Sequence, residues 1–330
     1  MRVLVFTNMY PFPAMPFYGS FVKDEVDAVR KSGVDVDVYF VNGKASKSNY
    51  IGAPFGLIRR LRERSYDVIH VHHSFCAFFA TLQKSIPVVW TFHEGEITSD
   101  ADVVRADRAI KRLAYSKGFK RAMARRVDAV VVVSSHLIEP LGLTDADTIP
   151  CGIDTRVFRP MDKTEAKERL GLDPAGKYVL FPSAPDRLEK RFELAEAGVT
   201  AYNRRSGAVL QLIGLDNVPH DEVPLRMNAC ELLLMTSAFE ASPVTIREAL
   251  ACNVPVISTD VGDVKAVIDG IDGCYIVDSD AGDIADKIDE ALSRTTQFAS
   301  RDNMADYSLD VTSKKLVALY ERVIEQKRRG

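Results

Sequence analysis

The chain has 330 residues, of which 46% are hydrophobic, 8% aromatic and 27% charged. This composition is that of a soluble globular protein, and the length favours two domains. It excludes a disordered or collagen-like chain and a disulfide scaffold. No apolar run approaches the roughly 20 residues that cross a bilayer. Because the first apolar run, Val3 to Phe6, is too short for a signal peptide, we expect a cytoplasmic protein.

The formal charge is −3 in total but differs between the two halves. Residues 1–160 carry a charge of +5, and residues 161–330 carry −8. Such an asymmetry predicts that the halves meet different partners. The five cysteines form no C-x-x-C motif, so we expect reduced and mostly buried thiols.

Short runs rich in Val and Ile alternate with helix-like segments in the first half of the chain. These runs lack polar alternation, as expected of parallel strands that helices cover on both faces. The predicted strands are residues 3–6, 36–41, 68–71, 88–92 and 129–133, and the predicted helices are 21–31, 55–64, 75–84 and 105–126. This β-α-β order predicts a doubly wound parallel sheet.

The same pattern restarts after a polar segment at residues 160–174. The predicted strands of the second half are residues 178–181, 209–213, 232–235, 256–257 and 275–277. We therefore expect an N-terminal Rossmann-like domain over 1–155 and a C-terminal one over 156–310. A final helix within 311–330 carries one apolar stripe and is expected to pack back on the first domain. In such folds the cleft between the domains is the expected site.

Two common nucleotide motifs are missing from the chain. No G-x-G-x-x-G follows the first strand of either half, and no G-x-x-x-x-G-K-[ST] segment is present. These absences argue against a dinucleotide-dependent dehydrogenase and against a P-loop kinase.

The most informative segment runs from Ser237 to Leu250 and reads S-A-F-E-A-S-P-V-T-I-R-E-A-L. It follows a predicted strand and starts a helix, for which Ser242 is a suitable N-cap and Pro243 a suitable first residue. The free N–H groups of the first helical turn predict an anion site.

Glu240 falls in the turn of this segment, and Glu248 falls inside the helix on a face of small and apolar residues. The helix dipole fades beyond the first turn and does not explain a carboxylate at position 248. One interpretation is a ligand-binding carboxylate, and the other is a surface glutamate that pairs with Arg247 or Asn253.

The spacing of Glu240 and Glu248, within F-E-A-S-P-V-T-I-R-E-A-L-A-C-N-V-P-V-I-S-T-D-V-G, resembles family 4 of the retaining glycosyltransferases. The opening loop, two strands that end in histidine, and the segment P-C-G-I-D-x-x-x-F-x-P resemble the same family, with Cys151 where the family has Asn. Within it, the chain looks most like bacterial cell-surface polysaccharide transferases of the teichuronic acid type. The resemblance implies the GT-B architecture, in which two Rossmann-like doubly wound domains face each other across a cleft.

The resemblance also implies roles for individual residues. Glu248 would bind the ribose hydroxyls, and Glu240 would contact the donor sugar. The backbone around Ser242, Pro243 and Val244 would hold the diphosphate or the sugar. Carboxylates suit vicinal hydroxyls because charge-assisted hydrogen bonds are among the stronger kinds.

The cations that the family directs at the diphosphate depart from the family pattern here. Ala184-Pro185 replaces the usual Gly-Arg, Lys190 matches the family lysine, and Arg187 is the candidate for the missing arginine. Gly19, in the first loop, is assigned to donor binding through the same resemblance. For the cations the alternative is a solvated helix start.

His93 matches a family position near the donor sugar, so we expect it at the site. His70, His72 and His73 form H-x-H-H at a strand end, which suits zinc, but no Asp or Cys nearby completes a set. We expect buried histidines bonded to backbone there, and no metal. Asp278-Ser279-Asp280 resembles D-x-D but follows a late strand. It is therefore expected to be a turn and helix cap.

The expected function is that of a metal-independent hexosyltransferase that moves a sugar from a UDP- or GDP-sugar to a hydroxyl acceptor with retention. It would need no resident cofactor, and the acceptor would be a saccharide or lipid-linked, in cell-surface polysaccharide or glycolipid synthesis. The alternatives are a non-catalytic nucleotide-sugar-binding subunit and a sugar-nucleotide epimerase of the same architecture. A fold analogy cannot separate the three.

The stretch from Arg105 to Arg126 carries nine Lys and Arg residues against the single Asp107. With its interspersed apolar residues it suits an anionic membrane surface. We therefore expect a peripheral location on the inner face of the cell membrane, the alternative being a solvated basic helix face. Nucleic-acid binding is not expected, because no aromatic interleaving accompanies the charge.

Overall fold

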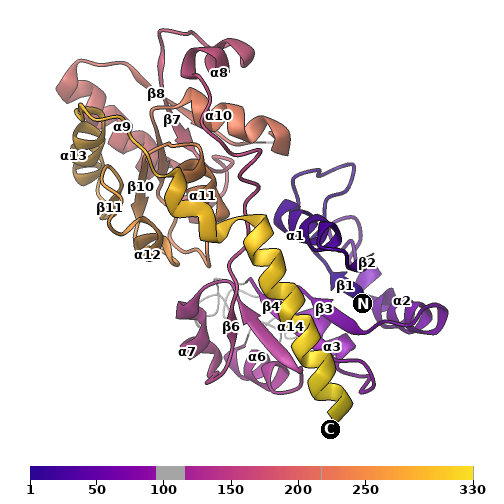
Figure 1. Ribbon diagram of the computed structural model, residues 1–330. Helices are drawn as coiled ribbons and strands as arrows, with labels where there is room; N and C mark the ends of the chain where they lie inside the picture. The colour runs from indigo at the N-terminus through magenta and orange to yellow at the C-terminus, as the bar shows by residue number, and fades with distance from the viewer. Residues whose placement is uncertain (94–115, 217, 330) are drawn as a thin grey trace. The chain divides into compact units, whose positions relative to one another are not determined.

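The computed structural model describes residues 1–93, 116–216 and 218–329 (Figure 1). It divides the chain into two compact units. Unit 1 comprises Met1–Gly152 and Leu309–Gly330, and unit 2 comprises Ile153–Ser308. Their limits lie close to residues 155 and 310, the predicted domain boundaries. Within the described ranges, no helix is both long and apolar enough to cross a membrane.

Unit 1 contains a parallel sheet of six strands in the order β2-β1-β3-β4-β5-β6. The strands are β1 (Arg2–Thr7), β2 (Asp35–Phe40), β3 (Val68–Val71), β4 (Val88–Phe92), β5 (Ala129–Val132) and β6 (Asp147–Thr148). The α-helices described in this unit are α1 (Ser20–Lys31), α2 (Asn49–Glu63), α3 (Ser74–Ala80), α6 (Lys117–Ala124), α7 (Ile138–Leu141) and α14 (Leu309–Arg329). The doubly wound α/β class predicted from the sequence is confirmed.

The core of unit 1 joins the two ends of the chain. Val3 and Val5 of β1 pack in one apolar cluster with Val22 and Val26 of α1. The same cluster contains Tyr320 and other residues of the apolar stripe of α14. Figure 1 shows α14 running beside this sheet. The last helix of the chain therefore completes the first folding unit.

Unit 2 contains a parallel sheet of five strands in the order β11-β10-β9-β7-β8. The strands are β7 (Lys177–Phe181), β8 (Leu210–Gly214), β9 (Leu232–Met235), β10 (Val256–Thr259) and β11 (Tyr275–Val277). The α-helices are α8 (Lys163–Arg169), α9 (Phe192–Ser206), α10 (Val223–Ala229), α11 (Val244–Ala251), α12 (Val264–Ile268) and α13 (Ala281–Leu292).

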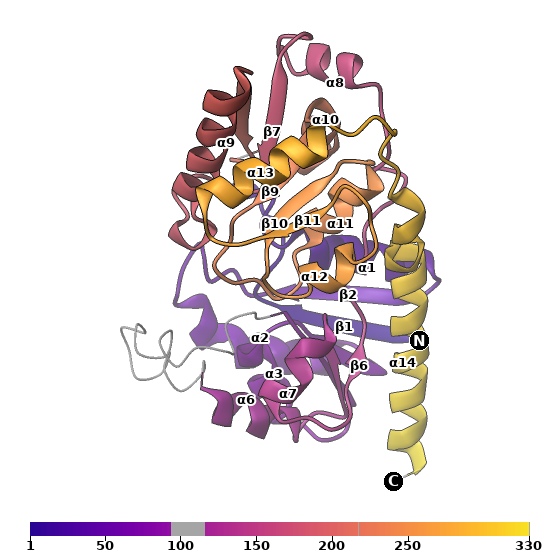
Figure 2. The same ribbon diagram turned by 90° about the vertical axis from the view of Figure 1, so that its left-hand side faces the viewer.

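Helices cover both faces of the sheet of unit 2. Along β7, Tyr178 and Leu180 join one apolar cluster, while Val179 and Phe181 join another. The second cluster contains residues of α9 and α13, which lie side by side in Figure 2. This double coverage explains why the strands read as continuous apolar runs in the sequence.

Two predicted helices differ from the structure. Helix α2 begins at Asn49 and not at residue 55, and Pro54 lies inside it. Its buried residues, Ala53 and Leu57, lie one turn apart on a single face. Of the helix predicted over 105–126, residues 105–115 lie outside the described residues, and the remainder forms α6.

Candidate functional site

The candidate site in unit 2 begins where β9 ends at Met235. Strand β9 lies between β10 and β7, so the loop that follows it leaves the carboxyl edge in the middle of the sheet. That edge is where ligands bind in open α/β sheets. The loop ends at α11, whose first residue is Val244.

The start of α11 differs by one residue from the prediction. Pro243 takes the N-cap position with an extended backbone, and the cap makes no side-chain hydrogen bond. Ser242 donates instead from Oγ to Asp263 Oδ2 at 2.9 Å. The predicted N-cap role of Ser242 and first-turn role of Pro243 are therefore wrong, because α11 begins one residue later than predicted and Ser242 lies before its N-cap.

Glu240 lies inside this loop and accepts two hydrogen bonds on one oxygen. Lys190 Nζ donates to its Oε1, and Ser237 Oγ donates to the same atom at 2.7 Å. The side chains of Lys190 and Glu240 are each 15% exposed. The structure thus brings together the carboxylate and the cation that the sequence proposed separately, and it adds Ser237, which the sequence did not single out.

The contact between Lys190 and Glu240 follows from the strand order. Lys190 ends a short 3-10 helix, Leu188–Lys190, in the loop after β7, and Glu240 lies in the loop after β9. Strands β7 and β9 are neighbours and run parallel, so their carboxyl ends share one edge. The two loops are also joined by the backbone, because Ala238 N donates to Glu189 O at 2.8 Å.

Arg191 connects the two loops through hydrogen bonds, a role that the sequence did not reveal. Its guanidinium donates to the carbonyl oxygens of Thr236 at 2.6 Å and Ser237 at 2.7 Å. Thr236 Oγ1 donates back to Arg191 O at 2.9 Å. Arg191 holds a left-handed backbone with φ of 53°, which costs free energy in a residue with a Cβ and persists only where the surroundings fix it.

Glu248 lies in the second turn of α11 and is buried, with 7% of its surface exposed. The alternative of a surface glutamate paired with Arg247 is therefore wrong. Arg247 donates to Asp263 Oδ2 at 2.5 Å and stacks over the ring of Tyr307. A buried carboxylate needs polar or charged partners. The ligand-binding role of Glu248 stays a prediction.

Arg187, the candidate for the missing family arginine, does not contact Glu240 or Glu248 in any interaction that the structure shows. Its Nη2 pairs with Glu189 Oε1 at 2.6 Å, and its side chain is 55% exposed. An exposed pair of this kind contributes little stability and can exchange its partner easily. Arg187 therefore stays a prediction for diphosphate binding.

A glycine holds the next loop against the Glu240 loop. Gly262 has a φ of +59°, and a Cβ there would lie 2.8 Å from Ala241 O. Only glycine combines this backbone with so close an approach. Gly262 therefore sets the shape of the turn between Glu240 and α11.

The candidate residues of unit 1 are His93 and Gly19. His93 follows β4 directly, and its Nε2 lies 3.0 Å from Nδ1 of His72, which follows β3. Strands β3 and β4 are parallel neighbours, so both histidines lie at one edge. His93 Nδ1 lies 3.6 Å from Cys151 Sγ. The cysteine that departs from the family motif is thus in contact with a predicted site residue.

Gly19 precedes α1 with a φ of +69°, and a Cβ there would lie 2.5 Å from the carbonyl carbon of Met9. The loop after β1 therefore passes directly against the start of this helix. The same helix turn carries Phe21, whose ring centre lies 4.9 Å from that of His93. Within unit 1, Gly19 thus supports the helix that packs on His93.

His70 and His72 are buried, but side chains and not backbone groups bond to them, contrary to the prediction. His73 is half-buried, and its Nδ1 accepts a hydrogen bond from the backbone N–H of Phe75 at 3.1 Å, as predicted. His70 Nε2 lies 2.6 Å from Thr91 Oγ1, and His70 Nδ1 lies 2.7 Å from Tyr320 Oη. The prediction found no Asp or Cys nearby to complete a ligand set, and the structure places a different carboxyl group there, since Glu25 of α1 lies 3.3 Å from His72 Nε2. The fold brings α1 onto β3, which sequence spacing does not show.

Ligand atoms of Glu25, His70 and His72 all lie within 4.8 Å of one another, which is the spacing of a possible metal site. Both nitrogens of His70 already have partners, however. Only Glu25 and His72 are left to bind an ion, fewer than the three protein ligands of a catalytic zinc site. We therefore interpret this group as a hydrogen-bonded network.

The D-x-D segment forms a turn and a helix cap, as predicted. Asp280 accepts hydrogen bonds from the backbone N–H groups of Gly282 and Asp283 at the start of α13. Asp283 accepts in turn from the backbone N–H of Asp278 at 2.7 Å.

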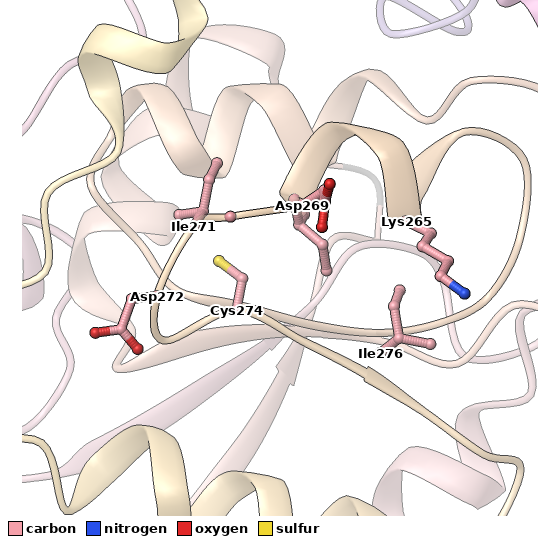
Figure 3. A pocket seen from close by; sticks show the side chains of 8 residues that line it. Lys265, Asp269, Ile271, Asp272, Cys274 and Ile276 are labelled. Atoms are coloured by element: carbon pink, nitrogen blue, oxygen red, sulfur yellow. The ribbon is translucent and has the colours of Figure 1, made fainter.

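A hollow of about 360 Å³ lies between α12 and the start of β11, lined by Lys265, Ile271 and Cys274 among others (Figure 3). Most of its lining belongs to the loop that leads into the amino end of β11. Glu240 follows the carboxyl end of β9, which is the other edge of a parallel sheet. This hollow is therefore separate from the candidate site.

In helix α6, one of the cations that were predicted to face a membrane is buried. Lys120 is fully buried, and its Nζ lies 5.3 Å from the centre of the Phe92 ring. It therefore cannot face a membrane. Arg121, Arg125 and Arg126 are exposed.

Two family models match the chain. The model described as "Glycosyltransferase Family 4" matches residues 2–157, and the model described as "Glycosyl transferases group 1" matches residues 206–310. The first match falls mostly within unit 1, and the second falls mostly within unit 2 and includes Glu240 and Glu248.

Curated relatives include a D-inositol 3-phosphate glycosyltransferase of Mycobacterium sp. (strain KMS), which is 27% identical over 301 residues. That match covers 80% of this chain and 68% of the relative. The enzyme of the same name from Mycobacterium tuberculosis (strain F11) is 26% identical over 312 residues, which cover 80% of this chain and 64% of the relative. The chain thus spans about two thirds of the length of these relatives.

Solved structures share the fold. A sucrose-phosphate synthase from Thermosynechococcus elongatus has a TM-score of 0.78 at 16% identity, with 99% of this chain and 100% of that one covered. HepE of Anabaena in complex with UDP has a TM-score of 0.71 at 14% identity, with 98% and 100% covered. These likenesses, together with the two parallel sheets, confirm the predicted GT-B class.

Proposed function

Because the chain belongs to family 4 of the glycosyltransferases, we propose that it transfers a sugar from a UDP- or GDP-sugar to a hydroxyl acceptor with retention at the anomeric carbon. The observation that carries this proposal is the arrangement at the carboxyl ends of β7 and β9. There Lys190 and Ser237 hold Glu240, and the buried Glu248 lies on the helix that follows.

In this proposal each group of unit 2 has one task. Glu248 accepts hydrogen bonds from the two ribose hydroxyls. Lys190 has three N–H donors, so it can keep its bond to Glu240 and still donate to a phosphate oxygen. The backbone N–H groups at the start of α11, from Val244 onward, add donors for the diphosphate. Arg187 gives up its ion pair with Glu189 and binds the same diphosphate.

Glu240 orients the sugar and does not attack it. Its Oε1 is held by two donors, whereas a retaining glycosidase keeps one carboxylate free as nucleophile and a second as acid. In the proposed step the acceptor oxygen bonds to the anomeric carbon while the bond to the diphosphate oxygen breaks. The acceptor proton passes to the leaving phosphate. Cations and N–H groups stabilise the departing charge, so no metal is required.

Solved relatives of the same fold support the choice of donor. Crystal structures of HepE of Anabaena contain UDP, UDP with glucose, and UDP-glucose. We propose a UDP-sugar as the first donor to test, and an acceptor in cell-surface polysaccharide or glycolipid synthesis.

The test is an assay of nucleotide release with and without candidate acceptors, after a thermal-shift screen of UDP, GDP and ADP with their sugars. A ligand at 100 times its Kd stabilises a protein by about 2.7 kcal/mol. A transferase releases nucleotide only when an acceptor is present. A binding subunit gives the thermal shift without release, and an epimerase converts the sugar nucleotide without an acceptor.

We further propose a peripheral membrane location for a lipid-linked acceptor. Besides the exposed arginines of α6, helix α2 presents Ile51, Phe55 and Ile58 to solvent, with 75%, 72% and 47% exposed. Exposed apolar residues at helical spacing, with cations on neighbouring positions, suit an anionic bilayer surface.

The test of this location is co-sedimentation with anionic liposomes at low and high salt. Charge reversal at Lys117, Arg121 and Arg125 is expected to release the protein, whereas reversal of exposed cations of α9, such as Arg204, is not. A protein that stays in the supernatant at low salt contradicts the proposal and favours a soluble acceptor.

A further inference from the structure

A chain of side chains in unit 1 connects a carboxyl group to His93. Glu25 Oε1 lies 3.3 Å from His72 Nε2, and His72 Nδ1 lies 3.0 Å from His93 Nε2. The rings of His72 and His93 are nearly parallel, with an interplanar angle of 17°. His93 Nδ1, at the end of this chain, lies 3.6 Å from Cys151 Sγ.

We propose that Glu25 is a positioning residue that sets, through His72, which nitrogen of His93 carries hydrogen. The hydrogen-bond order stands on the geometry of unit 1 alone. Its effect on catalysis rests on the proposed function, in which His93 contacts the donor sugar.

Glu25 has two histidine neighbours, and only one is available to it. His70 Nδ1 is 3.6 Å from Glu25 Oε1 but already pairs with Tyr320 Oη at 2.7 Å. His72 Nε2 is buried and has no hydrogen-bond partner among the described residues, and Glu25 Oε1 lies 3.3 Å from it. Burial of such an atom without a partner is costly. The carboxyl group of Glu25 is therefore the partner of His72.

Two hydrogen-bond orders satisfy this chain. With Glu25 protonated, its O–H donates to His72 Nε2, His72 Nδ1–H donates to His93 Nε2, and His93 must carry its hydrogen on Nδ1. With Glu25 ionised, each bond reverses, and His93 carries its hydrogen on Nε2 and has a bare Nδ1. A neutral imidazole has one donor and one acceptor, so no mixed order keeps both bonds.

The groups around Glu25 favour the protonated order at neutral pH. In the part of the chain that the structure describes, the titratable groups that face it from other elements are His70 of β3, His72 after β3, Tyr320 of α14 and, beyond them, His93. Burial raises the pKa of Glu25 to about 8 and lowers the pKa of His70 to about 3 and that of His72 as well. The neighbouring rings are neutral and give the carboxylate no counter-charge.

The hydrogen-bond order determines whether His93 Nδ1 donates a hydrogen bond to a ligand or accepts one from it. A thiol is a weak hydrogen-bond partner, so a sugar hydroxyl can replace Cys151 at His93 Nδ1. Below the pKa of Glu25 this nitrogen donates to the hydroxyl oxygen. Above that pKa it accepts from the hydroxyl and loses contact with any acceptor. Activity is therefore expected to fall on the alkaline side as Glu25 ionises.

The test is NMR of the whole protein labelled with 15N-histidine, with the His93 signals assigned by their loss in His93→Gln. In the wild type, His93 Nδ1 should change from a protonated to a bare nitrogen as the pH rises through about 8. In Glu25→Gln, the side chain cannot ionise, so His93 should keep one tautomer over the same pH range. Glu321→Gln, the same change at an exposed position of α14, should behave as the wild type does.

Several outcomes overturn the inference. The first is a wild-type His93 that keeps one tautomer from pH 6 to pH 9.5, a measurement that needs no variant to fold. The second is a Glu25→Gln protein that still switches. A third is stoichiometric zinc in the purified protein that Glu25→Gln loses, since that makes the group a metal centre. Because the NMR signal needs no turnover, a failed transferase assay leaves this test intact.

The pH dependence of kcat tests whether this change of the His93 tautomer affects the reaction. The alkaline limb of the kcat profile near pH 8 should be present in the wild type and absent in Glu25→Gln. If both proteins show the same limb while the NMR switch is present, the proton order of His93 has no part in the reaction.

Discussion

The two units hold carboxyl groups that are equally covered but surrounded by different charges. The side chains of Glu240 in unit 2 and Glu25 in unit 1 are each 15% exposed. Glu240 forms a salt bridge with Lys190. Glu25 faces histidine rings that burial keeps neutral, and the pKa of Glu25 rises to about 8. Burial raises the pKa of Glu25, and the neutral rings beside it give its carboxylate no counter-charge.

Both clusters arise from the same topological rule. Lys190 and Glu240 follow the neighbouring strands β7 and β9, and His72 and His93 follow the neighbouring strands β3 and β4. Parallel strands bring their carboxyl ends to one edge, so residues far apart in sequence meet there. The chemistry then depends on whether the meeting residues are charged or neutral.

The largest expected effect is at Glu248, the buried carboxylate beside the charged cluster. Glu248→Ala should weaken nucleotide-sugar binding by roughly 100-fold or more, because two charge-assisted hydrogen bonds of about 1.5–3 kcal/mol each are lost. Titration calorimetry with the nucleotide chosen by the thermal-shift screen measures this effect. Circular dichroism should show an intact fold, and Glu193→Ala, at an exposed position of α9, serves as control. An unchanged affinity for the nucleotide would contradict the assignment of Glu248 to the ribose.

The neutral surroundings of Glu25 predict a pH dependence of stability. Its pKa rises from 4.5 to about 8 on folding, so the folded state binds more protons than the unfolded state between these values. The contribution of Glu25 to the free energy of unfolding is full below pH 4.5. It falls by up to about 1.4 kcal/mol per pH unit towards pH 8.

Glu25→Gln should remove this slope, and urea unfolding of the whole protein at pH 5, 6.5 and 8 measures it. Relative to the wild type, the variant should gain stability as the pH rises. A variant whose stability runs parallel to that of the wild type shows that Glu25 keeps its charge in the folded protein, and the contrast with Glu240 then disappears.

A smaller effect is expected from the pair of Lys190 and Glu240. Glu240→Gln should lower kcat by roughly 10- to 100-fold while nucleotide affinity stays within about 3-fold, because the sugar loses an oriented carboxylate of about 1.4–2.7 kcal/mol. Lys190→Met should weaken both, since Lys190 is directed at the diphosphate as well.

A double-mutant cycle then isolates the contact between the two side chains. Its coupling should be about 0.5–3 kcal/mol, the range of directly paired residues. Turnover near that of the wild type in Glu240→Gln contradicts the sugar-facing role. A coupling near zero shows that the salt bridge has no energetic part in the site.

The smallest expected effect is that of a chelator. Activity should be unchanged by it, because cations and backbone N–H groups supply the positive charge at the diphosphate. The measurement is nucleotide release before and after treatment, with and without added Mg²⁺ or Mn²⁺. Complete loss, restored by a divalent ion, reopens the Glu25, His70 and His72 group and the Asp278 turn as ion sites.

The sequence by itself determined the α/β class and most of the strands, because a strand buried on both faces must be apolar throughout. It also indicated Glu240, Glu248 and Lys190, since their spacing matches a family pattern and turn residues precede the helix. Hydrophobic periodicity and short motifs are local, so both can be read along the chain.

Only the tertiary structure decided which of these groups meet. Arg191 acts through carbonyl oxygens of Thr236 and Ser237, which no residue pattern marks. Lys120 was predicted on a membrane-facing surface, but the packing of α6 buries it.

The network around His93 depends most on the tertiary structure. Glu25 lies on α1, His72 follows β3, and Tyr320 meets His70 across 250 positions of the chain. Such contacts come from the order of strands in the sheet and from the helices that pack on it. The pKa of a carboxyl group depends on the neighbours that this packing supplies. The sequence therefore shows that a glutamate is present, and only the fold determines the pH at which it ionises.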